Sequence, residues 1–249
     1  MGLMTFKGGV HPFEGKDLSK DKPIRELLPK GELVYPLSQH IGAPATPIVA
    51  VGDSVLKGQK IAEAGGFVSA PIHASVSGTV KKIEPRRVPT GDMVNSIVIE
   101  SDGEFKEVEY QAVEDVSALS KEEIINRIKE AGVVGMGGAG FPTHVKLSPK
   151  EPEKIDYIIA NCAECEPYLT SDYRIMLDHT EELVEGMRII LSMFEHAKGV
   201  FAVENNKPDC IAKLLELTKD EPRMEVAPLM TKYPQGGTSA YLCSNQTCN

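Results

Sequence analysis

Residues 120–228 alternate between amphipathic segments and short apolar runs, and this alternation most restricts the folds open to the chain. Apolar runs predict buried strands at 155–160, 200–203 and, more weakly, 224–228. Amphipathic patterns predict helices at 120–130, 178–198 and 207–217. The first helix opens with a capping box of Ser120 and Glu123. Strands and helices in turn are typical of a mostly parallel, Rossmann-like sheet, so we predict the α/β class for this region.

A glycine-rich loop follows the first helix and contains Gly135, Gly137, Gly138 and Gly140. Phe141 closes the loop, and Lys146 follows it. Because glycine has no Cβ, the N–H groups of such a loop can form a concave nest for a phosphate, with the lysine as a nearby point charge. A purely structural turn explains the same residues. The dinucleotide fingerprint Gly-x-Gly-x-x-Gly is less favoured, because it requires a strand before the loop and here a helix precedes it.

Polar side chains stand where the first predicted strand ends. Asn161, Glu164 and Glu166 follow the apolar run at 155–160. Ligands of α/β sheets bind at the carboxyl ends of the strands, so these residues and the glycine loop together predict a nucleotide or flavin site. The alternative is that the two carboxylates form a solvated pair without a ligand.

The segment from about 32 to 100 consists of short β runs separated by turn residues. Its runs fall at 33–35, 47–51, 60–62, 67–69, 75–77, 79–83 and 96–100. The pattern resembles the barrel-sandwich hybrid of biotinyl and lipoyl carrier domains, but the hairpin tip at 64–67 has no lysine to be acylated. We therefore expect an all-β module that docks or supports. The predicted domains are an arm at 1–30, the β module at 31–105, a linker at 106–119 and the α/β domain at 120–249.

Composition excludes several classes of protein. The net charge is −9, which argues against nucleic-acid binding. No apolar run is long enough to span a membrane, so we expect no transmembrane segment. The five cysteines are an odd number without a regular framework, which favours a reducing, cytoplasmic compartment. Cys162 and Cys165 form one Cys-x-x-Cys pair, and we predict structural thiols here, ahead of a zinc site or thiol redox chemistry.

Several separate motifs resemble one family, RnfC, whose members belong to the Rnf electron-transport complex. They occur in the family's order at 5–12, 36–44, 69–78, 135–143 and 163–168. From the glycine loop onward the chain also resembles the flavin subunit of respiratory complex I. The resemblance implies an NADH-oxidising subunit that uses FMN and 4Fe–4S clusters and exchanges electrons with ferredoxin. It implies a peripheral position on the cytoplasmic face of an ion-translocating membrane complex, with the other Rnf subunits as partners.

The resemblance also implies roles for individual residues. Gly135, Gly137, Gly138 and Lys146 match the loop that holds the FMN phosphate and ribityl chain, and Gly140 completes that loop. Phe141 stands where the nicotinamide approaches. The polar groups Asn161, Glu164 and Glu166 match the lining of the flavin and NADH pocket, and Tyr233 and Gly236 match a later loop over the flavin. Because hydride passes directly between the two cofactors, we predict no catalytic proton-transfer residue and no metal ligand.

The sequence departs from the family at several points. Met136 and Ala163 stand where the flavin protein of complex I has arginine and aspartate. After Gly237 we expect the resemblance to end, so that the rest of the flavin domain and the cysteine ligands of the 4Fe–4S clusters are absent from this chain. A shifted reading frame or a premature end would explain that pattern. The alternative functions are a cofactor-free fragment or docking module, and a cobalamin-reductase-like or proline-reductase-associated flavoprotein relative.

Overall fold

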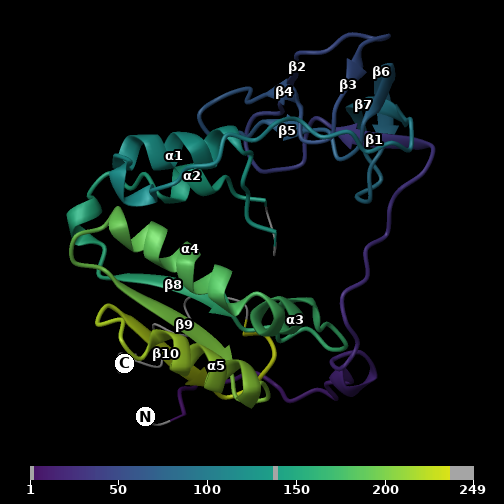
Figure 1. Cartoon of the computed structure of the whole chain (residues 1–249). Helices are drawn as coiled ribbons and strands as arrows, with labels where there is room; N and C mark the ends of the chain where they lie inside the picture. The colour runs from purple at the N-terminus through teal and green to yellow at the C-terminus, as the bar shows by residue number, and fades with distance from the viewer. Residues whose placement is uncertain (1–2, 137–139, 236–249) are drawn as a thin grey trace. The chain divides into compact units, whose positions relative to one another are not determined.

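The computed structural model describes residues 3–136 and 140–235. The chain forms two compact units, each of which is described by itself. The first, here called the α/β unit, combines Met1–Glu26 with Glu151–Asn249. The second, the β-rich unit, is the continuous stretch Leu27–Lys150. The elements of both units are labelled in Figure 1.

Two antiparallel sheets build the β-rich unit. The larger has the strand order β1-β7-β6-β3, with β1 at Glu32–Pro36, β3 at Ser54–Val55, β6 at Gly78–Arg87 and β7 at Met93–Ser101. The smaller has the order β2-β4-β5, with β2 at Thr46–Pro47, β4 at Lys60–Glu63 and β5 at Ile72–His73. The register pairs Tyr35 with Ile97 and Val80 with Ile99. These four side chains belong to the buried core of the unit, together with Ile61 and Val76.

Two of the predicted β runs, 67–69 and 75–77, are not strands in the structure. Buried serine hydroxyls take up the backbone hydrogen bonds there instead of a strand ladder. The hydroxyl of Ser69 accepts from the N–H of Gly65 at 2.9 Å. The hydroxyl of Ser77 donates to Asp102 at 2.7 Å and accepts from the N–H of Lys106 at 3.0 Å. Alternating β-branched residues and serines therefore indicated two false strands, because serine at these positions closes a turn.

The β-rich unit also contains helix α1 (Lys121–Glu130) and the short helix α2 (Thr143–Lys146). The predicted capping box is present: the Ser120 hydroxyl accepts from the Glu123 N–H, and the Glu123 carboxylate accepts from the Ser120 N–H. The end of α1 is tied to the sheets by an ion pair between Glu130 and Lys60 at 2.6 Å. The sequence placed residues 120–150 in the α/β domain. In the structure they cluster with the β module, and this contact is one physical reason for the difference.

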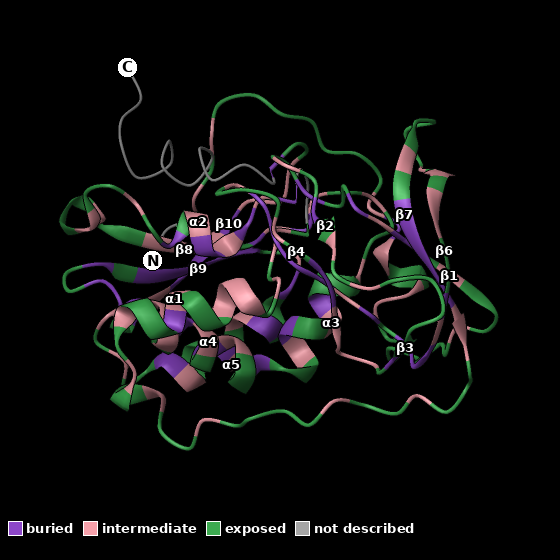
Figure 2. Ribbon diagram, turned by 90° about the horizontal axis from the view of Figure 1, so that it is seen from above, coloured by how far each residue is buried: buried purple, intermediate pink, exposed green. Residues whose placement is uncertain are grey.

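Within the described residues, the α/β unit has a parallel sheet of three strands in the order β10-β9-β8. The strands are β8 (Tyr157–Cys162), β9 (Lys198–Glu204) and β10 (Met224–Leu229), and the helices are α3 (Ser171–Asp178), α4 (Thr180–Ser192) and α5 (Pro208–Thr218). The central strand β9 is buried from its second residue to its last, as expected for a parallel strand covered on both faces (Figure 2). The predicted Rossmann-like parallel sheet is therefore confirmed.

The single long helix predicted at 178–198 is wrong. The segment holds two helices, because His179 has φ −126° and ψ 37°, outside the helical region, and separates α3 from α4. Helix α4 ends at Ser192, well before Gly199. The side chain of Arg223 explains this end, since its guanidinium donates to the carbonyl oxygens of Leu191, Phe194 and Ala197. These oxygens have no helical partners at a helix C-terminus and accept from the arginine instead.

The N-terminal arm packs on the α/β unit. Met4 forms a parallel β-bridge with Leu229, and Val10 forms an antiparallel bridge with Tyr233. A 3-10 turn, η1 (Lys16–Leu18), follows. The arm thus runs beside β10 and past the carboxyl ends of the strands, which neither its polar composition nor its glycines indicated. Among the helices of the described residues, none is long and apolar enough to cross a membrane.

Two of the cysteines are buried in the α/β unit. Cys162 ends β8 and Cys210 lies in α5, and burial raises the pKa of each thiol to about 12. Cys165 is half-buried, and its sulfur accepts from the N–H of Gln235 at 3.2 Å. Cys243 and Cys248 lie outside the described residues. Cys162 and Cys165 thus differ sharply in exposure although they share one motif.

Alkylation of the folded chain with iodoacetamide at mildly alkaline pH is expected to label Cys165 at least about tenfold faster than Cys162 or Cys210. The thiolate is the reactive form, and the raised pKa keeps both buried thiols protonated below about pH 11. Mass spectrometry of the digested protein gives the rate for each cysteine. Equal labelling of Cys162 and Cys165 would contradict the structure.

Gly42 and Gly52 offer a matched test of the β-rich unit. Both have positive φ, +99° and +97°, but a Cβ at Gly42 would lie 2.0 Å from the carbonyl oxygen of Val68, whereas a Cβ at Gly52 meets nothing within 4 Å. Gly52→Ala is expected to lower the free energy of unfolding by about 1–2 kcal/mol, the cost of the left-handed backbone alone. Gly42→Ala should cost about 1–3 kcal/mol more, because the backbone must also move.

Urea unfolding followed by circular dichroism measures both variants. Equal losses of stability in the two variants would show that the loop at Gly42 is not packed against Val68.

Candidate functional site

The glycine loop closes on itself at a neck in the β-rich unit. The N–H of Gly135 donates to the carbonyl oxygen of Phe141 at 2.9 Å, and Val134 forms an antiparallel bridge with Pro142. Gly140 has φ +61°, and a Cβ there would lie 2.9 Å from the carbonyl oxygen of Gln39, so only glycine fits. Gly137 and Gly138 lie outside the described residues. The neck therefore holds the two ends of the loop together.

Lys146 stands beside this neck. It ends helix α2, is exposed, and its Nζ lies 5.9 Å from the centroid of the Phe141 ring. The same Nζ lies 3.5 Å from the position that a Cβ on Gly135 would occupy. The structure thus brings Gly135, Phe141 and Lys146 together, as the sequence predicted. A closed glycine loop with an exposed ammonium group at its neck suits a phosphate, since the ammonium is a point charge.

The other predicted residues lie in the α/β unit, at and beyond the carboxyl end of β8. Asn161 and Glu166 are exposed, whereas Glu164 is buried, with an exposed fraction of 4%. Tyr233 is 36% exposed and pairs with Val10 of the arm through backbone hydrogen bonds in both directions, each 2.8 Å. Gly236 lies outside the described residues. The predicted site residues are therefore divided between the two units.

Glu164 is engaged with its own unit. One carboxylate oxygen, Oε1, accepts from the backbone N–H of Asp172 at 2.8 Å and from the Ser171 hydroxyl at 3.5 Å, and so caps the first turn of α3. The other oxygen, Oε2, lies 3.8 Å from Nζ of Lys16 and has no hydrogen-bond partner in the described chain. A negative charge at a helix N-terminus is stabilised by the helix dipole.

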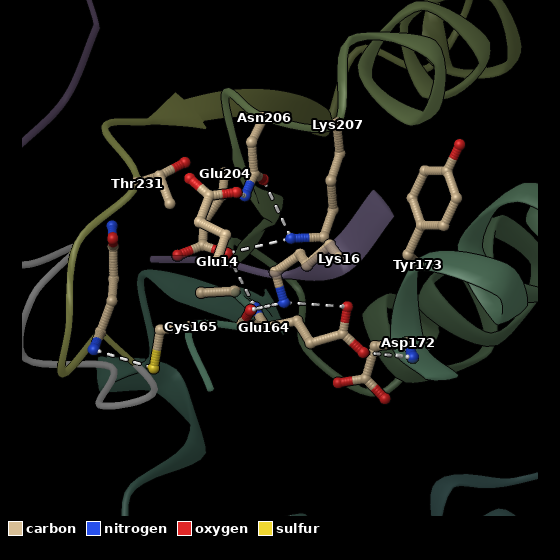
Figure 3. Close-up of polar contacts among 12 residues, drawn as sticks. Glu14, Lys16, Glu164, Cys165, Asp172, Tyr173, Glu204, Asn206, Lys207 and Thr231 are labelled. Carbon is tan, nitrogen blue, oxygen red and sulfur yellow. Dashed lines mark hydrogen bonds and ion pairs between the residues drawn. The ribbon is translucent and has the colours of Figure 1, made fainter. Parts of the chain in front are cut away.

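Lys16 belongs to a cluster of largely buried charges that the sequence did not reveal (Figure 3). Glu204, at the end of β9, accepts on Oε2 from the N–H of Glu164 at 3.1 Å and from Nζ of Lys207 at 3.0 Å. Glu14 of the arm accepts from the side-chain amide of Asn206 at 2.8 Å. Desolvation lowers the pKa of Lys16, and the Glu164 carboxylate opposes that shift. The ends of β8 and β9 are thus joined to the arm through side chains of both signs.

Part of this cluster has a signal in the sequence. Glu204 follows the predicted strand at 200–203 directly, so the strand-end argument applied to Glu164 extends to it. Nothing in the sequence around Lys16 indicated burial, because the arm is polar throughout. In the parts of the chain that the structure describes, no group of three or more His, Cys, Asp or Glu side chains is arranged to hold a metal ion.

Comparisons with known proteins match both units. The family described as the RnfC barrel sandwich hybrid domain matches residues 4–104, and the Nuo51 FMN-binding domain matches residues 128–245. The second match continues past Gly237, so the prediction that the resemblance ends there is wrong. In the solved NAD+-reducing NiFe hydrogenase (H2-reduced state), the likeness covers 52% of this chain and 25% of that chain, at 22% identity and a TM-score of 0.41.

Curated relatives share one name, that of the RnfC component of ion-translocating complexes. The RnfC protein of the Na(+)-translocating ferredoxin:NAD(+) oxidoreductase complex of Acetobacterium woodii is 44% identical over 93% of this chain and 53% of its own length. The proton-translocating counterpart from Clostridium ljungdahlii is 45% identical over 94% of this chain and 51% of its own length. The chain spans about half the length of these relatives. With both domain matches in order, the chain belongs to the RnfC family of electron-transport complex proteins.

Proposed function

We propose that this chain binds FMN and NADH and carries the NADH-oxidising step of an Rnf-type electron-transport complex. The observation that carries the proposal is the closed neck of the glycine loop with the exposed ammonium of Lys146 beside it. The match of residues 128–245 to an FMN-binding domain supports the same reading. FMN accepts a hydride from NADH and releases the electrons one at a time to further carriers.

The residues present fit FMN. Its phosphate requires cationic and N–H donors, and the neck offers Lys146 together with the glycine-rich backbone. The exposed amide of Asn161 and carboxylate of Glu166 are suited to bind hydroxyl groups of a ribityl chain or a ribose. Glu164 differs from both, since its carboxylate is buried against α3 and Lys16. We therefore assign it to holding the strand-end loop rather than to contact with a cofactor.

The chain's own contribution to the reaction is binding and orientation. Hydride transfer between two bound rings needs their faces held in register and water kept away, and it needs no acid or base from the protein. Lys146 fixes one end of the flavin through its phosphate. Phe141, which the neck holds beside Lys146, presents an aromatic face suited to a nicotinamide ring.

The wider role is also part of the proposal. The relatives are named as subunits of ferredoxin:NAD(+) oxidoreductase complexes that translocate Na(+) or protons. We infer that this chain exchanges electrons between NAD(H) and ferredoxin through further carriers, next to other Rnf subunits at the cytoplasmic face of the membrane. The 4Fe–4S clusters expected in the family would be held by protein segments other than the residues that the structure describes.

Lys146→Met is expected to weaken FMN binding by roughly tenfold or more, because a charge-assisted contact to the phosphate is lost. Titration of the purified chain, followed by flavin fluorescence, measures the dissociation constant. Lys150→Met is the matched control: it makes the same change at an exposed lysine four residues further on. Riboflavin, which has no phosphate, should bind the wild-type chain and Lys146→Met equally.

Equal FMN affinities for Lys146→Met and Lys150→Met would contradict the phosphate assignment. Absence of FMN binding by the wild-type chain would favour a cofactor-free docking module.

A further inference from the structure

The side chain of Lys16 ends inside the loop that joins β8 to α3. Its Nζ donates to three backbone carbonyl oxygens, those of Glu164 at 2.7 Å, Glu166 at 3.1 Å and Leu169 at 2.7 Å. An ammonium group has three N–H donors, so these bonds use all of them. The carboxylate of Glu164 adds an opposite charge at 3.8 Å. The loop therefore wraps around the ammonium as carbonyl groups wrap around a bound cation.

The loop depends on the arm at a second point. Tyr168 has φ +68°, which is unfavourable for a residue with a side chain, and its N–H donates to the carbonyl oxygen of Glu14 at 2.7 Å. Gly15 makes room for it, because a Cβ there would lie 2.3 Å from the Tyr168 ring. Three consecutive arm residues thus clamp residues 164–169, and the loop's conformation is imposed by the arm rather than by its own preferences.

We propose that Lys16 is a positioning residue: a tethered cation that shapes residues 164–169 and so presents Glu166 to the flavin and NADH site. The functional half of this proposal rests on the proposed function, whereas the shaping of the loop does not. Lys16 itself is not assigned to contact with a cofactor. It acts through the carbonyl groups of the loop, between which Glu166 stands exposed.

A cavity of about 600 Å³ gives small molecules access to this position. Lys16 lines it together with the exposed Phe13 and with Asp17, Lys20 and Lys207. The other two lysines are paired, Lys20 with Asp17 at 2.5 Å and Lys207 with Glu204 at 3.0 Å. Among the described lining residues the cavity thus offers no unpaired ammonium group to an anion. A small alkylammonium ion, however, can enter it and occupy the place of a deleted lysine side chain.

Chemical rescue of Lys16→Ala tests the proposal. Hydrogen–deuterium exchange of the peptide covering 164–169 reports the loop without any cofactor, and the KM for NADH of the FMN-loaded chain reports the site. We expect Lys16→Ala to speed exchange at least about tenfold and to raise the KM similarly, with a smaller change in kcat. Propylammonium should restore both at least partly. Tetramethylammonium at the same ionic strength has no N–H donor and should restore neither.

Two further variants complete the design. Lys20→Ala removes a lysine that lines the same cavity but pairs only with the exposed Asp17, and it should behave as the wild-type chain. Lys16→Arg keeps the charge, and it covers the case in which Lys16→Ala does not fold. Its planar guanidinium cannot direct three bonds to three converging carbonyls, so exchange at 164–169 should remain faster than in the wild-type chain.

Unchanged exchange in Lys16→Ala, wild-type exchange in Lys16→Arg, or equal rescue by both ammonium ions would overturn the proposal. If the wild-type chain binds no FMN, the proposed function fails, and the exchange measurement still decides whether Lys16 shapes the loop.

Discussion

The ammonium of Lys16 makes the interaction on which the carboxyl edge of the parallel sheet depends. It lies among three backbone carbonyls of the loop after β8 and beside the buried Glu164. Glu164 in turn caps α3, and Lys16 is its ion-pair partner within the described chain, so loss of Lys16 would leave a buried charge without compensation. An N-terminal residue thereby controls the geometry of a loop nearly 150 positions later in the chain, and a second pair, Glu204 and Lys207, adjoins it.

Elements governed by local sequence were predictable. The capping box of α1 depends on two side chains three positions apart, and both of its hydrogen bonds are present. The apolar runs of β8, β9 and β10 predicted buried parallel strands, because burial on both faces leaves no polar alternation. The convergence of Gly135, Phe141 and Lys146 also followed from short sequence separation and glycine geometry.

Features governed by distant contacts were not predictable. The early end of α4 depends on Arg223, which binds carbonyl oxygens of the segment 191–197 from more than 25 positions away. The placement of residues 120–150 with the β module depends on contacts such as Lys60 with Glu130. Glu164 had the right position for a ligand-binding carboxylate, but its burial depends on Lys16, whose polar surroundings carried no signal. Periodicity reports which face of an element is apolar, and not which remote side chain satisfies its ends.

The most direct test of the proposed function is anaerobic addition of NADH to the chain loaded with FMN, with the absorbance of the oxidised flavin as the readout. We predict bleaching that saturates with NADH and reaches one flavin reduced per NADH oxidised. Bound FMN that remains oxidised at saturating NADH would contradict the claim that these residues bind and orient both cofactors.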